Sequence, residues 1–176
     1  MLENKKVQRA LDFATQKHKG QKRKGGNDYI THPIAVCEMV KKQGYGEDFQ
    51  IAALFHDLLE DTNATQKEIL EYGNQNVLSA VKLLTKEKGY DMQKYIEGIK
   101  GNQIAFVVKC ADRLHNLQCA IDTDEEFKRK YILETIDWYL DFSQDIKNQV
   151  KKLAESLDTP IAELSFLYSP IESWKI

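Results

Sequence analysis

The chain has 176 residues, of which 42% are hydrophobic and 30% charged, and it contains only nine glycines and three prolines. This length favours one compact domain, and the composition is not that of a disordered, collagenous or low-complexity chain. Charges interrupt every apolar stretch before it reaches the roughly 18 residues of a membrane span. The formal net charge of −2 argues against a broad basic surface. We therefore expect neither nucleic acid nor a membrane as a partner.

The first 25 residues are too charged for a signal peptide, so we expect a cytoplasmic location. The three cysteines, Cys37, Cys110 and Cys119, lack the spacing of a metal finger, and each lies in a stretch with apolar periodicity. We expect buried, reduced thiols and no disulfide framework.

Hydrophobic residues recur with helical period from the start of the chain. Their spacing over 7–14 predicts a first helix that ends near His18. A second helix is predicted over 31–44, because Thr31-His32-Pro33 is typical of a helix start and Gly44 of a stop. Asp48 is expected to cap a third helix, whose body over 51–59 is mostly apolar and therefore buried.

The second half of the chain continues in the same way. Residues 65–68 fit a capping box, and Gly73 is expected to end the short helix that follows. Apolar residues then predict helices over 77–84, 91–99 and 104–114. Residues 123–126 fit a second capping box, which is expected to open one long helix through Val150.

No segment alternates with period two, and no linker divides the chain. The predicted fold is therefore all-α, a single-domain helical bundle over 1–176, with a less regular tail after Pro160. One connection stands out, from about Lys19 to Ile30, because loops of about 12 residues are uncommon and often functional.

The third predicted helix carries the most informative polar residues, His56-Asp57-Leu58-Leu59-Glu60-Asp61. A buried helix should not carry an imidazole and three carboxylates without a use, because lone buried charges are costly. Residues four apart share a face, which places His56 under Glu60 and Asp57 under Asp61. The alternative interpretation is a solvated polar edge at the end of a helix.

Two other segments offer similar side chains. His32 lies at a predicted helix start, where it could be an ordinary capping histidine. Asp112 lies inside a predicted helix, where it could simply pair with Lys109 or Arg113. Taken together, two imidazoles and two carboxylates suit Mn²⁺, Fe²⁺ or Zn²⁺, and they leave positions for water and a phosphate oxygen, as metal-assisted hydrolysis requires. This candidate set consists of His32, His56, Asp57 and Asp112.

The order His, His-Asp, Asp resembles that of the HD-domain phosphohydrolase superfamily. More specifically, the sequence is similar to the hydrolase domain of RelA/SpoT-type proteins and to the stand-alone small alarmone hydrolases. Nothing in the chain corresponds to the synthetase half of the larger proteins. The segments that carry the resemblance are His18–Gly25, Tyr29–Pro33, His56–Thr62 and Lys109–Asn116.

The resemblance implies an Mn²⁺-dependent enzyme that removes the 3′-pyrophosphate from guanosine tetra- or pentaphosphate, giving GDP or GTP and pyrophosphate. It implies metal binding by His32, His56, Asp57 and Asp112, catalysis by Glu60 and Asp61, and nucleotide contacts from Arg23, Lys24 and Asn116. A polyanionic nucleotide also suits the local positive charge of the loop, although a solvated lysine loop is the alternative. The basic residues are Lys17, Lys19, Lys22, Arg23 and Lys24.

The chain departs from the alarmone hydrolases around the nucleotide. Gly25 stands where they commonly carry serine, and Leu117-Gln118-Cys119 stands where Met-Arg-Thr is usual. Polar groups expected close to the nucleotide are therefore missing. This leaves two alternatives open: an HD-domain phosphohydrolase that acts on another nucleotide or phosphate ester, and a helical module that binds a nucleotide or partner without turnover.

Overall fold

Helices account for the regular secondary structure of residues 4–158. The computed structural model describes residues 4–158, and within that range it contains no strand, only an isolated bridge between Lys22 and Asp28. The α-helices are α1 (Lys5–Lys17), α2 (Thr31–Lys42), α3 (Glu47–Phe55), α4 (Leu58–Asp61), α5 (Gln66–Tyr72), α6 (Gln75–Leu84), α7 (Met92–Lys100), α8 (Gln103–Cys119), α9 (Glu125–Trp138) and α10 (Gln144–Glu155). Two short 3-10 helices are η1 (Ala120–Asp122) and η2 (Leu140–Phe142). The all-α class is confirmed.

The described chain forms two compact units that divide within α8. The first unit extends to His115, and the second begins at Asn116. A single domain over 1–176 stays a prediction, and the tail after Pro160 lies outside the described residues. No helix in the described part of the chain is both long and apolar enough to cross a membrane.

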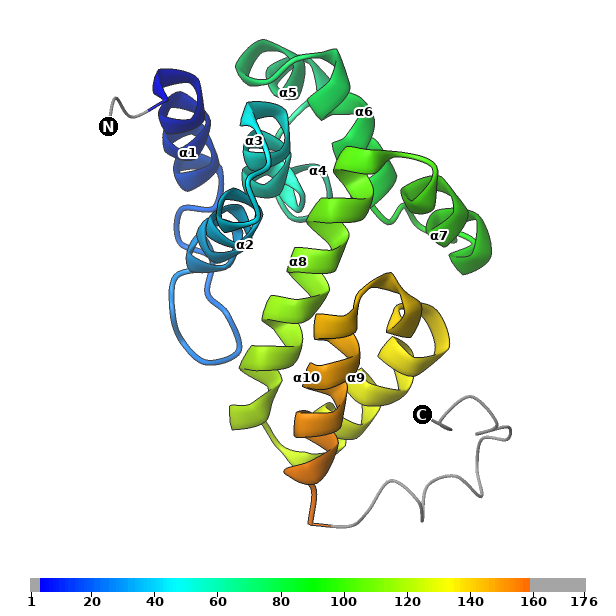
Figure 1. Ribbon diagram of the computed structural model, residues 1–176. Coiled ribbons are helices and arrows are strands. Elements are labelled where there is room, and N and C mark those ends of the chain that lie inside the picture. Colours follow the sequence, from blue (N-terminus) through cyan, green and yellow to red (C-terminus); the bar gives the residue numbers. More distant parts are fainter. Residues whose placement is uncertain (1–3, 159–176) are drawn as a thin grey trace. The chain divides into compact units, whose positions relative to one another are not determined.

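The first unit is built around α3, which packs against α1, α2 and α6 (Figure 1). Its residues 51–55 are at most 2% exposed, as expected for an apolar helix. Burial of one large aliphatic or aromatic side chain stabilises a fold by about 1.5–3 kcal/mol, so α3 contributes much of the core. Because α3 is buried in the core, the polar residue that follows Phe55, His56, is buried as well.

The predicted continuous helix over 51–59 is wrong, because the chain breaks between α3 and α4 at His56 and Asp57. The His56 ring donates through Nδ1 to the Ala53 carbonyl oxygen at 2.7 Å. In an unbroken helix that carbonyl would accept from the Asp57 amide, so the imidazole competes with the backbone. His56 and Asp57 therefore occupy a junction between helices.

The other boundaries in the first unit follow the predictions closely. The Thr65 capping box with Glu68 is present, and Gly73 ends α5. The exception is the start of α3, where Gly46 is the N-cap and Asp48 lies in the first turn. Asp48 instead accepts hydrogen bonds from side chains at the start of α6, Asn74 and Asn76.

In the second unit the predicted long helix is also wrong, because α9 and α10 are separate and pack against each other. Asp124 caps α9, and Ser143 caps α10 by accepting from the Ile146 amide. Between them the backbone of Ser143 is extended, with φ −160° and ψ 158°. Tyr139 and Phe142 fill the turn, with ring centroids 5.3 Å apart. Burial of these two aromatic rings favours the turn over a straight helix.

No disulfide joins the three cysteines, all of which lie in the described part of the chain. Burial raises the pKa of Cys37 to about 11 and that of Cys110 to about 12, so both remain thiols. The expectation of burial is wrong for Cys119, which is exposed. It ends α8 beside the exposed Gln118, beyond the apolar stripe of that helix.

Candidate metal centre

Four of the predicted site residues come together in the first unit. His32 lies in the first turn of α2, His56 and Asp57 lie at the α3–α4 junction, and Asp112 lies on α8. One atom each from His32, His56 and Asp57 fall within 4.8 Å of one another, which is close enough to share a cation. Both imidazoles are almost inaccessible, with exposures of 2% and 3%.

The imidazole nitrogens and carboxylate oxygens point at one another. His32 Nε2 is 3.2 Å from His56 Nε2, and both face the two acids. Asp112 Oδ1 is 3.1 Å from His32 Nε2 and 3.7 Å from His56 Nε2. Asp57 Oδ2 is 3.0 Å from His56 Nε2 and 3.9 Å from His32 Nε2. Asp112 therefore joins the group through the two histidines.

Each of the four side chains also contacts a second partner outside this group. The His32 Nδ1 atom is 2.8 Å from His115 Nδ1, and the His56 Nδ1 atom bonds to a backbone carbonyl. Lys109 donates to Asp112 Oδ2 at 2.8 Å. The Tyr29 hydroxyl donates to Asp57 Oδ2 at 2.7 Å. Such outer partners fix the ring orientation and tautomer of metal-binding histidines.

Burial and charge oppose each other in this group. Burial would lower the pKa of His56, but the carboxylates of Asp57 and Asp112 outweigh it and raise this pKa to about 9. Burial lowers the pKa of His32. Burial would raise the pKa of both acids, yet His56 holds that of Asp57 at about 2 and Lys109 lowers that of Asp112. At neutral pH Asp57 and Asp112 are therefore charged, and His56 is the imidazole that carries a second proton.

These residues fit a divalent cation. The two Nε2 atoms, 3.2 Å apart, face carboxylate oxygens in a buried space, and their other nitrogens are already engaged. A divalent cation would take the place of the proton on His56, because metal ligands must be deprotonated, and His32, His56, Asp57 and Asp112 are the side chains that would hold it. Mixed nitrogen and oxygen donors without thiolates suit Mn²⁺, Fe²⁺ or Zn²⁺.

The predicted acid pair lies on the short helix α4, and both members are exposed. We call the four candidate ligands, His32, His56, Asp57 and Asp112, the metal group. Asp61 lies beside this group, because its Oδ2 atom is 3.0 Å from the Tyr29 hydroxyl, which also contacts Asp57. Glu60 instead accepts from the Lys86 amide at 2.8 Å. Asp61 is thus linked to Asp57 through the shared Tyr29 hydroxyl, and catalysis by Glu60 and Asp61 stays a prediction.

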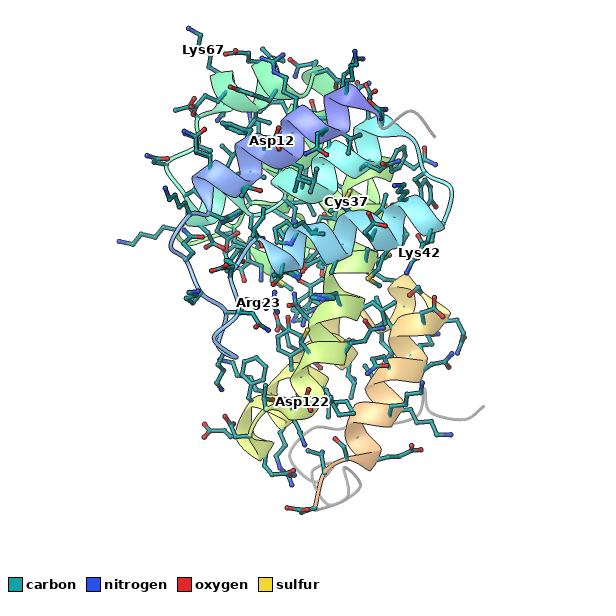
Figure 2. All side chains as sticks on the ribbon, turned by 90° about the vertical axis from the view of Figure 1, so that its left-hand side faces the viewer. Asp12, Arg23, Cys37, Lys42, Lys67 and Asp122 are labelled. Carbon is teal, nitrogen blue, oxygen red and sulfur yellow. The ribbon has the colours of Figure 1, made fainter. Side chains whose placement is uncertain are left out.

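The basic loop between α1 and α2 carries Arg23, as Figure 2 shows. The loop closes through the bridge at Lys22, whose side chain pairs with Asp28 at 2.6 Å. Lys17 belongs to α1 and forms an ion pair with Glu68 of α5 at 2.9 Å, so it links two helices and is not part of the loop. Lys24 is exposed near the tip.

Arg23 lies close enough to the metal group to act on its electrostatics. Burial, the neighbouring His32 and the positive charge of Arg23 together lower the pKa of His115 to about 4. Asn116 follows His115 on α8 but is the first residue of the second unit. Its contact with a nucleotide stays a prediction.

Sequence reasoning missed two residues that contact the proposed ligands, Tyr29 and His115. The pairing of Asp112 with Lys109 was one of its alternatives, and that ion pair is present. Both missed residues lie within the segments 29–33 and 109–116, which carry the resemblance. Their proximity in sequence to His32 and Asp112 was the available signal. Burial and the two carboxylates raise the pKa of Tyr29, so its hydroxyl stays protonated.

Comparisons with known proteins match residues 10–145 to the HD domain. The guanosine-3′,5′-bis(diphosphate) 3′-pyrophosphohydrolase of Aquifex aeolicus is 34% identical over 161 residues, which cover 84% of this chain and 23% of that protein. The protein of the same name from Borreliella burgdorferi is 29% identical over 178 residues, covering 94% and 26%. The GTP pyrophosphokinase rsh of Brucella melitensis is 30% identical over 164 residues, covering 84% and 22%.

The chain therefore spans about a quarter of the length of the curated relatives that it matches. A solved structure described as "A metazoan ortholog of SpoT hydrolyzes ppGpp and plays a role in starvation responses" superposes with a TM-score of 0.71. It is 22% identical and covers 88% of this chain and 97% of that chain, which shows a shared fold. The family match extends over most of the sequence, and the chain belongs to the HD domain family, which implies that it binds a divalent metal.

Proposed function

We propose that this chain removes the 3′-pyrophosphate from guanosine tetra- or pentaphosphate in an Mn²⁺-dependent reaction, giving GDP or GTP and pyrophosphate. The observation that carries the proposal is the buried convergence of two imidazoles with two carboxylates. The proposed ligands are His32, His56, Asp57 and Asp112. A cytoplasmic location, and a nucleotide rather than a nucleic acid as the partner, stay parts of this proposal.

The names of the relatives support the substrate. Those from Aquifex aeolicus and Borreliella burgdorferi are named as 3′-pyrophosphohydrolases, whereas that from Brucella melitensis is named as a GTP pyrophosphokinase. Hydrolysis rather than synthesis is proposed for this chain, because its polar residues form a metal-type hydrolytic group.

The chemistry follows from the roles of the side chains. A divalent cation at this group would polarise a phosphoryl oxygen and lower the pKa of a water molecule. Asp61, exposed beside the group and in contact with Tyr29, is placed to orient a water and accept its proton. Glu60 is held by the Lys86 amide and contributes negative charge at the rim. Arg23, Lys24 and Asn116 are proposed to bind the nucleotide.

The test is hydrolysis of guanosine tetraphosphate by protein supplied with Mn²⁺. Asp57→Ala and Asp112→Ala should each abolish the release of pyrophosphate, because each removes one proposed ligand. Asp12→Ala is the matched control, since Asp12 lies on α1 (Figure 2) and its carboxylate accepts a hydrogen bond from Gln8 of the same helix. Activity that survives in both ligand variants would contradict the proposed site.

A second candidate function, hydrolysis of another nucleotide, is favoured by Gly25. A Cβ atom at this position would meet no other atom within 4 Å, so packing does not impose glycine there. The loop could therefore hold a serine at this position, and glycine there removes a hydroxyl that could contact the nucleotide. A panel of nucleotides separates the two functions: faster release of orthophosphate from another substrate than of pyrophosphate from guanosine tetraphosphate favours the second.

A further inference from the structure

The loop between α1 and α2 reaches the metal group through Tyr29, near its end. The Tyr29 hydroxyl is 2.7 Å from Asp57 Oδ2 and 3.0 Å from Asp61 Oδ2. The same Asp57 oxygen is 3.0 Å from His56 Nε2. One phenol thus lies between a proposed metal ligand and a proposed catalytic acid and contacts both.

A phenol at this position has a defined physical effect. It carries one proton at neutral pH, so the two carboxylates share a single donor. Asp57 and Asp61 are four residues apart and lie on one face, where two like charges repel. Hydrogen bonds from a hydroxyl to a carboxylate are short and strong, and a donor placed between two carboxylates offsets that repulsion and fixes their separation.

Tyr29 is itself held in place by the base of the loop. The buried His18 ring stacks on it, with ring centroids 4.8 Å apart. His18 Nδ1 donates to the side-chain oxygen of Gln21 at 2.7 Å. The backbone carbonyl of Gln21 accepts from the Tyr29 amide at 3.0 Å. Gln21 also donates to the backbone carbonyl of Asp61 at 2.6 Å. Two residues of the loop therefore hold Asp61, one at the backbone and one at the carboxylate.

We propose that Tyr29 is a positioning residue whose hydroxyl fixes the metal ligand Asp57 and the acid Asp61 relative to each other. Through Gln21 and His18 the same contact ties both acids to the loop that carries the basic residues. The roles of Asp57 and Asp61 rest on the proposed function, whereas the contacts among these side chains do not.

The first test is Tyr29→Phe, which removes the hydroxyl and keeps the ring that stacks on His18. We expect Mn²⁺ to bind about tenfold more weakly by calorimetry, because loss of an outer partner usually costs about 10–100-fold in metal affinity or activity. With Mn²⁺ saturating, kcat for guanosine tetraphosphate should fall while KM stays close to that of the wild type, because no nucleotide contact is removed.

The matched control is Tyr72→Phe. Tyr72 is half-buried like Tyr29 and stacks on Phe13, with centroids 4.2 Å apart, but it lies on α5. This variant should keep the Mn²⁺ affinity and both kinetic constants. Mn²⁺ affinity and kcat that are unchanged in Tyr29→Phe would overturn the proposal, even if this variant unfolds at a lower temperature.

A double-mutant cycle with Asp61→Asn tests the link to the acid. Residues that act through one contact give non-additive effects, so Tyr29→Phe should lower kcat less in the Asp61→Asn background than in the wild type. Fully additive losses would overturn the link. If the wild type does not cleave guanosine tetraphosphate, the proposed function fails, and the Mn²⁺ affinity of Tyr29→Phe still decides whether Tyr29 positions Asp57.

Discussion

At the scale of single residues, the two ring nitrogens of His32 have different neighbours. Nε2 faces the proposed cation position, and Nδ1 is 2.8 Å from His115 Nδ1. A neutral imidazole that offers Nε2 to a metal carries its proton on Nδ1. If His32 offers Nε2 to a cation, His115 Nδ1 would accept the hydrogen bond from His32 Nδ1 and so favour the tautomer that metal binding requires.

Two variants at His115 test whether this residue sets the tautomer of His32. His115→Leu removes the acceptor and should weaken Mn²⁺ binding by about tenfold or more, the usual effect of losing an outer partner. His115→Asn places an amide oxygen close to the position of Nδ1 and should retain most of the affinity. Titration calorimetry with Mn²⁺ measures both. Equal affinities for the wild type and both variants would contradict the role of His115.

Sequence reasoning identified the candidate ligands and offered the pair of Asp112 with Lys109, but it did not predict the contacts that Tyr29 and His115 make. His32, His56, Asp57 and Asp112 were proposed because their residue types suit a metal, and the structure brings them together. The contacts of Tyr29 with Asp57 and of His115 with His32 join residues 28 and 83 positions apart. Helical spacing relates only residues within a few turns, so pairs this distant cannot be read from it.

At the scale of elements, the start of α5 is attached to α1 by Glu68. Its carboxylate closes the capping box with the Thr65 amide at 2.8 Å and pairs with Lys17 at 2.9 Å. The hydrogen bonds from Lys17 and from Thr65 hold the pKa of Glu68 at about 2. Because folding lowers this pKa, the charge of Glu68 stabilises the fold at neutral pH.

The pH dependence of this stabilisation can be predicted. Its full value holds above the ordinary carboxyl pKa of about 4.3 and is lost as the pH falls toward 2. Glu68→Gln keeps a side chain suited to the capping box but removes the charge. The wild type should therefore lose more of its free energy of unfolding than Glu68→Gln between pH 6 and pH 3.

Urea unfolding at several pH values measures this difference. Glu71→Gln on the same helix is the control, since its ion pair with Arg9 is long, at 3.6 Å, and both partners are largely exposed. It should follow the wild type throughout. The same pH dependence in the wild type and Glu68→Gln would contradict the account.

The elements also show where helical periodicity stops being informative. It located the helices of the first unit except α4, which it merged with α3, because amphipathic stripes and caps such as Thr65 are local signals. It missed the breaks at His56 and at Ser143, where the apolar pattern continues across the interruption. The first break follows from a side chain competing for a backbone carbonyl, and the second from the packing of Tyr139 and Phe142.

At the scale of the molecule, the proposed ligands and acids all belong to one unit. All four proposed ligands, both acids and the basic loop lie at or before His115, whereas Asn116 opens the second unit. The family match over 10–145 includes both units. The central claim is that the metal group in the first unit removes a 3′-pyrophosphate from a guanosine nucleotide. A test of this claim must vary the metal and identify the products.

The most direct measurement uses metal-stripped protein, resupplied with Mn²⁺ and given guanosine tetraphosphate, with GDP and pyrophosphate quantified separately. We predict equimolar GDP and pyrophosphate with Mn²⁺, and neither product after chelation. Mn²⁺-loaded protein that binds the nucleotide and leaves it intact, or that releases orthophosphate instead, would contradict the central claim.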